Sequence, residues 1–145
     1  KPRRPDKEDG IRRSQRLLLT WLIETPALFE KIEGVITADD FVEDLYHQVA
    51  QMVFDGHREG NLNPAAILSR FINDEDQYKE VAALFNASLK ESLNNEEQKK
   101  AFSETVMKVR KNSLDVASRN AKDITQLQEI IRQQAALKQL HISLD

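Results

Sequence analysis

Residues 102–116 read FSETVMKVRKNSLDV, and within them one set of side chains recurs at alternating steps of four and three. This spacing is a heptad seam along one face of a helix, formed by Phe102, Val106, Val109, Ser113 and Val116. The last glycine of the chain is Gly60 and the last proline is Pro64, so the two strongest helix breakers are missing from everything that follows. The pattern therefore predicts a long helix in the last third of the chain.

A second helix is expected after residues 118–123, which read SRNAKD and are cap and turn formers. Asp123 is followed three residues later by Gln126, which is the spacing of a capping start. Two helices joined by so short a turn lie antiparallel. We therefore predict that the chain ends in a helical hairpin.

The second helix of this hairpin carries two apolar stripes. At about 100° per residue, one stripe lies nearly opposite the other on the helix surface. The first comprises Ile124, Leu127, Ile131 and Ala135, and the second comprises Ile130, Leu137, Leu140 and Leu144. One stripe is enough to pack on the preceding helix. The other must dock on the rest of the protein, self-associate or meet a different protein. Under the partner-binding hypothesis the candidate residues are Ile130, Leu137, Leu140 and Leu144, but the spacing alone leaves open which of the two stripes faces the partner.

The chain before residue 94 is expected to form shorter helices. The apolar arc of residues 11–24 is broad enough for the central helix of a bundle. Cap signals then predict helix starts at Thr25-Pro26, at Thr37 with a continuation to about Glu59, and at Asn63-Pro64. No four-residue apolar–polar alternation occurs, so no sheet is predicted. The predicted fold is all-α: a compact bundle of about six helices in residues 1–110, with residues 1–8 linker-like, followed by a long helix and a hairpin subdomain in residues 111–145.

Composition indicates a soluble globular protein. The 145 residues are 40% hydrophobic and 31% charged, and cysteine is absent, which fits a cytoplasmic location. No run approaches the roughly 18 apolar residues of a membrane helix, so no membrane partner is expected. The opening residues 1–6 read KPRRPD and resemble a linker, so we expect a fragment of a longer protein.

The net charge of −3 conceals a gradient along the chain. Residues 1–16 carry +4, residues 17–93 carry −9, and residues 94–145 carry +2. Phosphate backbones require clustered cations, so the acidic centre argues against nucleic acid as the main partner. Weak binding through the basic N-terminal arm and a few cations of the last third remains an alternative; those cations are Lys99, Lys100, Lys108, Arg110 and Lys111.

The sequence carries no complete motif for catalysis, a metal or a cofactor. Asp44 and His47 have the spacing of half a di-iron carboxylate motif, but the second half and the extra carboxylates are missing. The sequence has no His-Glu-x-x-His motif, no glycine-rich phosphate loop and no Gly-x-Ser-x-Gly elbow. We therefore assign no catalytic, metal or cofactor residue, and we expect neither enzyme activity nor a small-molecule ligand for this chain.

One order of short motifs resembles a known family. It comprises Ser14-Gln15-x-Leu17-Leu18, Asp40-Phe41, Tyr46-His47, Gly60 and Asn63-Pro64-x-x-Ile67. This order resembles the helical bundle shared by the N-terminal domain of bacterial replicative helicases and the C-terminal domain of bacterial (DnaG-type) primases. The long helix and final hairpin are similar to the primase arrangement, in which the hairpin docks on the helicase.

The resemblance implies a non-catalytic interaction domain. It would bind the hexameric replicative helicase through that helicase's N-terminal domains, recruit primase to the replication fork and modulate helicase activity. The parent protein would be a DNA primase whose catalytic domain lies elsewhere. The isolated chain is expected to be a monomer. Self-association of a helical domain in a replication protein is the alternative.

Overall fold

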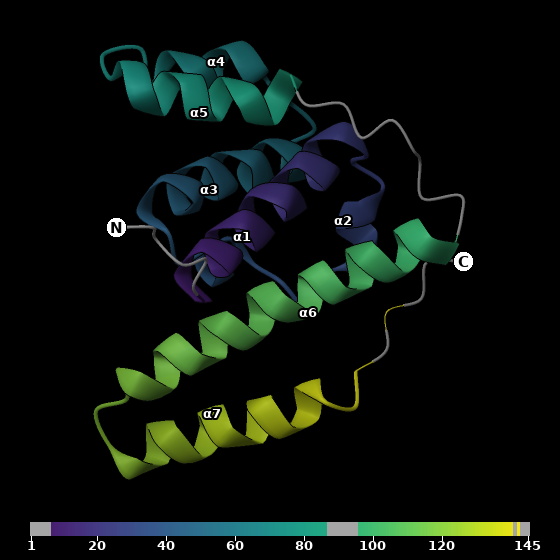
Figure 1. Ribbon diagram of the computed structural model, residues 1–145, viewed down its shortest axis with the longest axis vertical. Helices are drawn as coiled ribbons and strands as arrows, with labels where there is room; N and C mark the ends of the chain where they lie inside the picture. Colours follow the sequence, from purple (N-terminus) through teal and green to yellow (C-terminus); the bar gives the residue numbers. More distant parts are fainter. Residues whose placement is uncertain (1–6, 87–95, 141, 143–145) are drawn as a thin grey trace, which may run out of the picture.

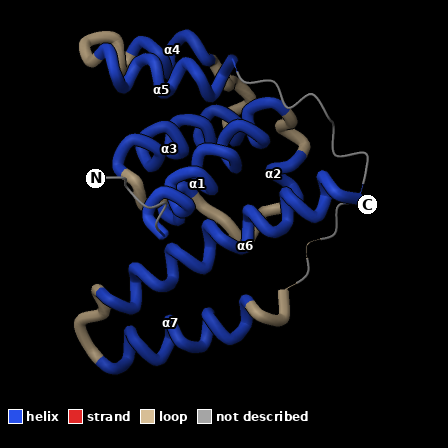
Figure 2. The backbone as a smooth tube through the Cα atoms, in the orientation of Figure 1, coloured by secondary structure: helices blue, strands red, loops and turns tan. Residues whose placement is uncertain are grey.

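The computed structural model describes residues 7–86, 96–140 and 142, and all regular structure within these ranges is helical (Figures 1 and 2). This confirms the predicted all-α fold. The elements in chain order are α1 (Lys7–Glu24), α2 (Leu28–Lys31), the 3₁₀ helix η1 (Ala38–Asp40), α3 (Asp44–Arg58), α4 (Pro64–Ser69), α5 (Glu75–Asn86), α6 (Glu96–Arg119) and α7 (Ile124–Leu137).

Helix α1 is the centre of the bundle, as its broad apolar arc predicts. It contacts α6 on one side and α3 and α5 on the others (Figure 1). Leu18, Leu19 and Leu22 are completely buried. Each fully buried leucine contributes about 1.5–3 kcal/mol of transfer free energy, so α1 holds the surrounding helices together.

Two of the predicted helix boundaries are confirmed by specific backbone contacts. The Asn63 side chain accepts hydrogen bonds from the backbone N–H groups of Ala65 and Ala66, and Pro64 is the first helical residue of α4. Gly60 follows α3 with φ of 71°, a conformation that residues with a Cβ rarely adopt. The cap at Asn63 and the backbone conformation of Gly60 therefore define the turn between α3 and α4.

The prediction that one helix runs from Thr37 to about Glu59 is wrong. The start forms only η1, and the backbone is extended at Phe41 and Glu43 before α3 begins at Asp44. Asp40 accepts a hydrogen bond from the Thr37 backbone N–H through one carboxylate oxygen and pairs with Arg110 through the other. A long-range partner therefore holds Asp40 and ends the short helix. Helix α2 likewise begins at Leu28, two residues after the predicted Pro26.

Helix α6 is continuous for 24 residues and crosses residue 110, where the boundary between the two subdomains was predicted. The first part of its seam faces the core, where Phe102, Val106 and Val109 are buried. Farther along, Ser113 and Val116 are half-buried, and Leu114 is buried instead. The buried face shifts because the end of α6 packs against α7 (Figure 1).

Candidate functional site

The hairpin begins with a capped turn at the start of α7. The Asp123 carboxylate accepts a hydrogen bond from the Gln126 backbone N–H at 2.8 Å. The Gln126 side-chain oxygen accepts one from the Lys122 backbone N–H at 3.0 Å. The predicted capping start is therefore confirmed, and α7 runs antiparallel to α6 (Figure 1).

The face of α7 that lies against α6 is partly polar. Ile130 and Leu137 are half-buried there. Between them, Gln133 accepts a hydrogen bond from Arg110 at 3.0 Å, and Gln134 donates one to Asp115 at 3.1 Å. None of the 14 residues of α7, all of which the structure describes, is fully buried. Two half-buried apolar side chains and two glutamine bonds thus connect α7 to α6.

The face of α7 that adjoins its α6-facing side exposes large apolar side chains. Ile124 is 71% exposed, Ile131 is 51% exposed and Leu127 is 36% exposed. We call these three residues the α7 stripe. Because they recur at three and four residues, they form one continuous strip on the helix. Helix α7 therefore exposes more large apolar side chains than it half-buries.

The charged groups of α7 pair with each other within the helix. The Arg132 guanidinium contacts the Glu129 carboxylate, and Gln133 donates a hydrogen bond to the same carboxylate at 3.1 Å. Hydrogen bonds from Arg132 and then Gln133 lower the pKa of Glu129 to about 2. Because Glu129 and Arg132 carry opposite charges, together they add no net charge to α7.

The residues predicted to bind the partner do not lie in the α7 stripe. Ile130 and Leu137 face α6, and Leu140 lies beyond the end of α7, packed against the core. Ile142 follows Leu140 and is buried in the same core, whereas Leu144 lies outside the described residues. The assignment of Ile130, Leu137, Leu140 and Leu144 to a partner stays a prediction, and the first three are less accessible than the α7 stripe.

Two glutamines that connect the hairpin, Gln133 and Gln134, were not singled out by the sequence, and Arg110 was named there only among the cations for weak nucleic-acid binding. With Asp115 these residues form the polar contacts of the hairpin, and each falls outside the apolar patterns. Long-range pairing of an arginine or glutamine leaves no periodic signal in a sequence. The one signal in the sequence for the inner face of α7 is the pair of adjacent glutamines, Gln133 and Gln134, which lies between apolar residues.

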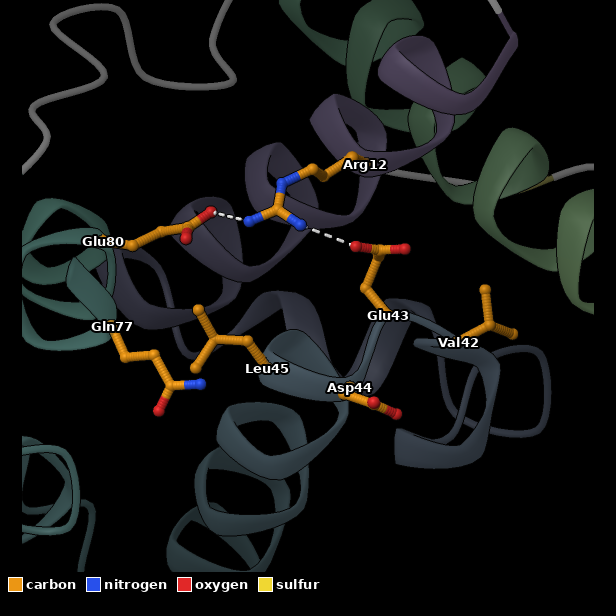
Figure 3. Close-up of a pocket in the computed structure, with 7 residues that line it drawn as sticks. All are labelled: Arg12, Val42, Glu43, Asp44, Leu45, Gln77 and Glu80. Carbon is orange, nitrogen blue, oxygen red and sulfur yellow. Dashed lines mark hydrogen bonds and ion pairs between the residues drawn. The ribbon is translucent and has the colours of Figure 1, made fainter. Parts of the chain in front are cut away.

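A second candidate is a cavity of about 440 Å³ among α1, α3 and α5 (Figure 3). Arg12 crosses its wall and pairs with Glu43 at 2.6 Å and with Glu80. The Tyr46 hydroxyl donates a hydrogen bond to Glu80 at 2.6 Å. Burial and this bond to a carboxylate raise the pKa of Tyr46. The remaining lining residues are Val42, Asp44, Leu45 and Gln77.

The groups of this cavity are bound to each other. Burial favours a raised pKa for Glu80, but hydrogen bonds from Tyr46 and Arg12, with the charge of Arg12, lower it below the usual value. Glu80 is therefore an ionised partner of Arg12 and Tyr46. This arrangement has a structural role, because its hydrogen bonds and ion pairs join α1, α3 and α5.

Of the two residues considered for a metal site, His47 contacts a backbone carbonyl group and Asp44 lies at the cavity. His47 places its Nδ1 3.0 Å from the Ala38 carbonyl oxygen, and Asp44 lines the cavity at the start of α3. Within the part of the chain that the structure describes, no group of three or more potential metal ligands comes together. Of the described helices, none combines the length and apolar character needed to cross a bilayer.

Comparison with known proteins adds no relative. No protein-family model, no curated protein and no solved structure matches the chain.

Proposed function

We propose that this chain is the helicase-binding domain of a bacterial primase and that the α7 stripe is its docking surface. The resemblance rests on the order of motifs from Ser14 to Ile67 and on a long helix followed by a hairpin. In this proposal, the domain recruits primase to the hexameric helicase at the replication fork, in the bacterial cytoplasm, and modulates helicase activity. Catalysis belongs to another part of the parent protein.

The exposed face of α7 is the observation that carries the proposal. A helix at the end of a hairpin that exposes Ile124, Leu127 and Ile131 offers an apolar strip to a groove between helices. Large exposed apolar side chains in a contiguous strip are typical of interaction sites. The partner's contribution would be a complementary apolar groove on its N-terminal domains.

The proposal uses residues of α7 other than those that the sequence favoured. Ile130, Leu137 and Leu140 are half-buried against α6 and the core, and recruiting them would require α7 to leave α6. The α7 stripe needs no such rearrangement. The two faces can therefore be told apart by substitution.

Calorimetric titration into a purified hexameric replicative helicase tests the proposal. Leu127→Asp with Ile131→Asp should weaken binding by more than about 30-fold, because losses of 1 kcal/mol or more per anchor are typical of interface centres and about 1.4 kcal/mol equals tenfold. Thr125→Asp is the matched control, since it adds a charge to an exposed position of the same helix that lies outside the α7 stripe. If the chain does not bind the helicase, or if the control weakens binding equally, the proposal fails.

Self-association through the same strip is the second candidate, because an exposed apolar helix face also fits a second copy. Sedimentation of the isolated chain at micromolar concentration separates the two. A monomer leaves the α7 stripe available to a different protein. A dimer that Leu127→Asp with Ile131→Asp dissociates would favour self-association.

A further inference from the structure

Arg110 occupies the junction of the bundle, the long helix and α7. It follows Val109, the last core residue of the α6 seam, and precedes Leu114, which is buried outside that core cluster. The Arg110 side chain is 26% exposed. It therefore lies where α6 changes from one set of contacts to the other.

The guanidinium of Arg110 is shared between two elements. Its Nη1 lies 2.8 Å from the Asp40 carboxylate on η1, and its Nη2 donates a hydrogen bond to the Gln133 side-chain oxygen on α7 at 3.0 Å. The Asp40 side chain is only 4% exposed, and its other oxygen accepts the Thr37 backbone N–H at 2.8 Å. Asp40 is thus a fixed point of the bundle that orients Arg110.

This pair selects one arrangement of α7. A guanidinium is planar and presents its donors in a rigid fork, so the bond to Asp40 fixes where the other edge of Arg110 points. Apolar contacts such as those of Ile130 and Leu137 are not directional and permit helices to shift. A change in the α6–α7 angle breaks the bond to Gln133, and withdrawal of Arg110 leaves the buried Asp40 carboxylate without its ion pair, which is unfavourable.

We propose that Arg110 is a positioning residue that holds the α7 stripe at one angle to the bundle. A partner that contacts both the hairpin and the bundle then meets two surfaces in a fixed relationship. The role of a partner rests on the proposed function, whereas the angle between α7 and the bundle is a property of this chain alone.

Pulsed electron paramagnetic resonance measures the distance between two spin labels in solution. The width of the distance distribution reports how tightly that angle is held. The chain has no cysteine, so labels can be placed at Arg13→Cys on α1 and Gln128→Cys on α7, both exposed positions. Arg110→Lys keeps a cation beside Asp40 but cannot form both bonds of the fork. Gln133→Ala removes only the bond on α7. Both variants should at least double the width of the distance distribution.

Lys108→Met is the matched control, because it removes a cation from an exposed position of the same helix. The width of its distance distribution should equal the width found without substitution at residues 108, 110 and 133. If either Arg110→Lys or Gln133→Ala matches this control, the proposal is overturned. A thermal melt checks that all variants remain folded.

The measurement is independent of the helicase. If the chain binds no helicase but the distributions broaden as expected, the proposed function fails and the positioning role stands. If binding is found but the distributions stay narrow, the positioning role fails alone. For a chain that binds, Arg110→Lys should also weaken helicase affinity while the α7 stripe is intact.

Discussion

The indole ring of Trp21 on α1 meets the phenyl ring of Phe102 on α6 edge to face, with centroids 5.4 Å apart and planes at 83°. Trp21 is 4% exposed and Phe102 is completely buried. Edge-to-face pairs add about 0.5–1.5 kcal/mol to the burial of their surfaces. The start of the long helix that carries the hairpin is thereby anchored to the centre of the bundle.

Phe102→Ala should therefore destabilise the whole bundle. Removing a buried phenylalanine costs about 3–5 kcal/mol, because the lost burial is accompanied by a cavity. Urea unfolding monitored by the fluorescence of Trp21, the only tryptophan, measures the change. Leu127→Ala is the comparison, and its partly exposed side chain should cost less than about 1 kcal/mol. Equal losses in the two variants would contradict the packing described for α1 and α6.

Glu80 should make the stability of the bundle depend on acid pH. Its pKa is lowered in the folded state by Tyr46 and Arg12, against the effect of burial. A lowered folded pKa gives stability that is present above the unfolded pKa of about 4.3 and is lost as pH falls through the folded pKa. Urea unfolding at pH values from about 6 to about 3 should show a steeper loss for the native chain than for Glu80→Gln.

The control for this pH series is Glu75→Gln. Glu75 lies on the same helix, and its side chain, which is 81% exposed, pairs with Lys79 one turn farther along. Its replacement should leave the slope of unfolding free energy against pH nearly unchanged, since exposed pairs contribute little. If Glu80→Gln and Glu75→Gln flatten the slope to the same degree, the pH dependence of stability does not come from the network of Arg12, Tyr46 and Glu80.

Leu140→Asp should lower the melting temperature, whereas Leu127→Asp should not. Leu140 packs against the core beside the buried Ile142, so a carboxylate there would be desolvated without a partner. Leu127 belongs to the exposed α7 stripe. Thermal unfolding followed by circular dichroism compares the two. If Leu140→Asp leaves the melting temperature unchanged, the core packing of Leu140 is contradicted and this residue is again a candidate for partner binding.

Local signals in the sequence were sufficient for much of the architecture. Asn63-Pro64, Gly60 and the Asp123–Gln126 pair each fix a helix end through contacts within a few residues. The seam of Phe102, Val106 and Val109 identified the buried face of α6. Such features depend on short-range geometry, so the sequence alone carries them.

The orientation of α7 could not be obtained in this way. Its apolar pattern offered two faces of similar strength, and the inner face is set by Gln133 and Gln134, which bond to Arg110 and Asp115. The same limit applies to Asp40, whose pairing with Arg110 spans 70 positions in the chain. Contacts between polar residues so far apart have no periodicity, and only the folded chain reveals them.

Methyl NMR of the isoleucine side chains tests the central claim most directly. Ile124 and Ile131 lie in the α7 stripe, Ile130 faces α6, and Ile142 is buried in the core, so one labelling scheme reports on each environment. Titration with the N-terminal domain of a replicative helicase should shift or broaden Ile124 and Ile131 first and leave Ile142 nearly unchanged. Perturbation of Ile130 and Ile142 with Ile124 and Ile131 unaffected would contradict docking through the α7 stripe.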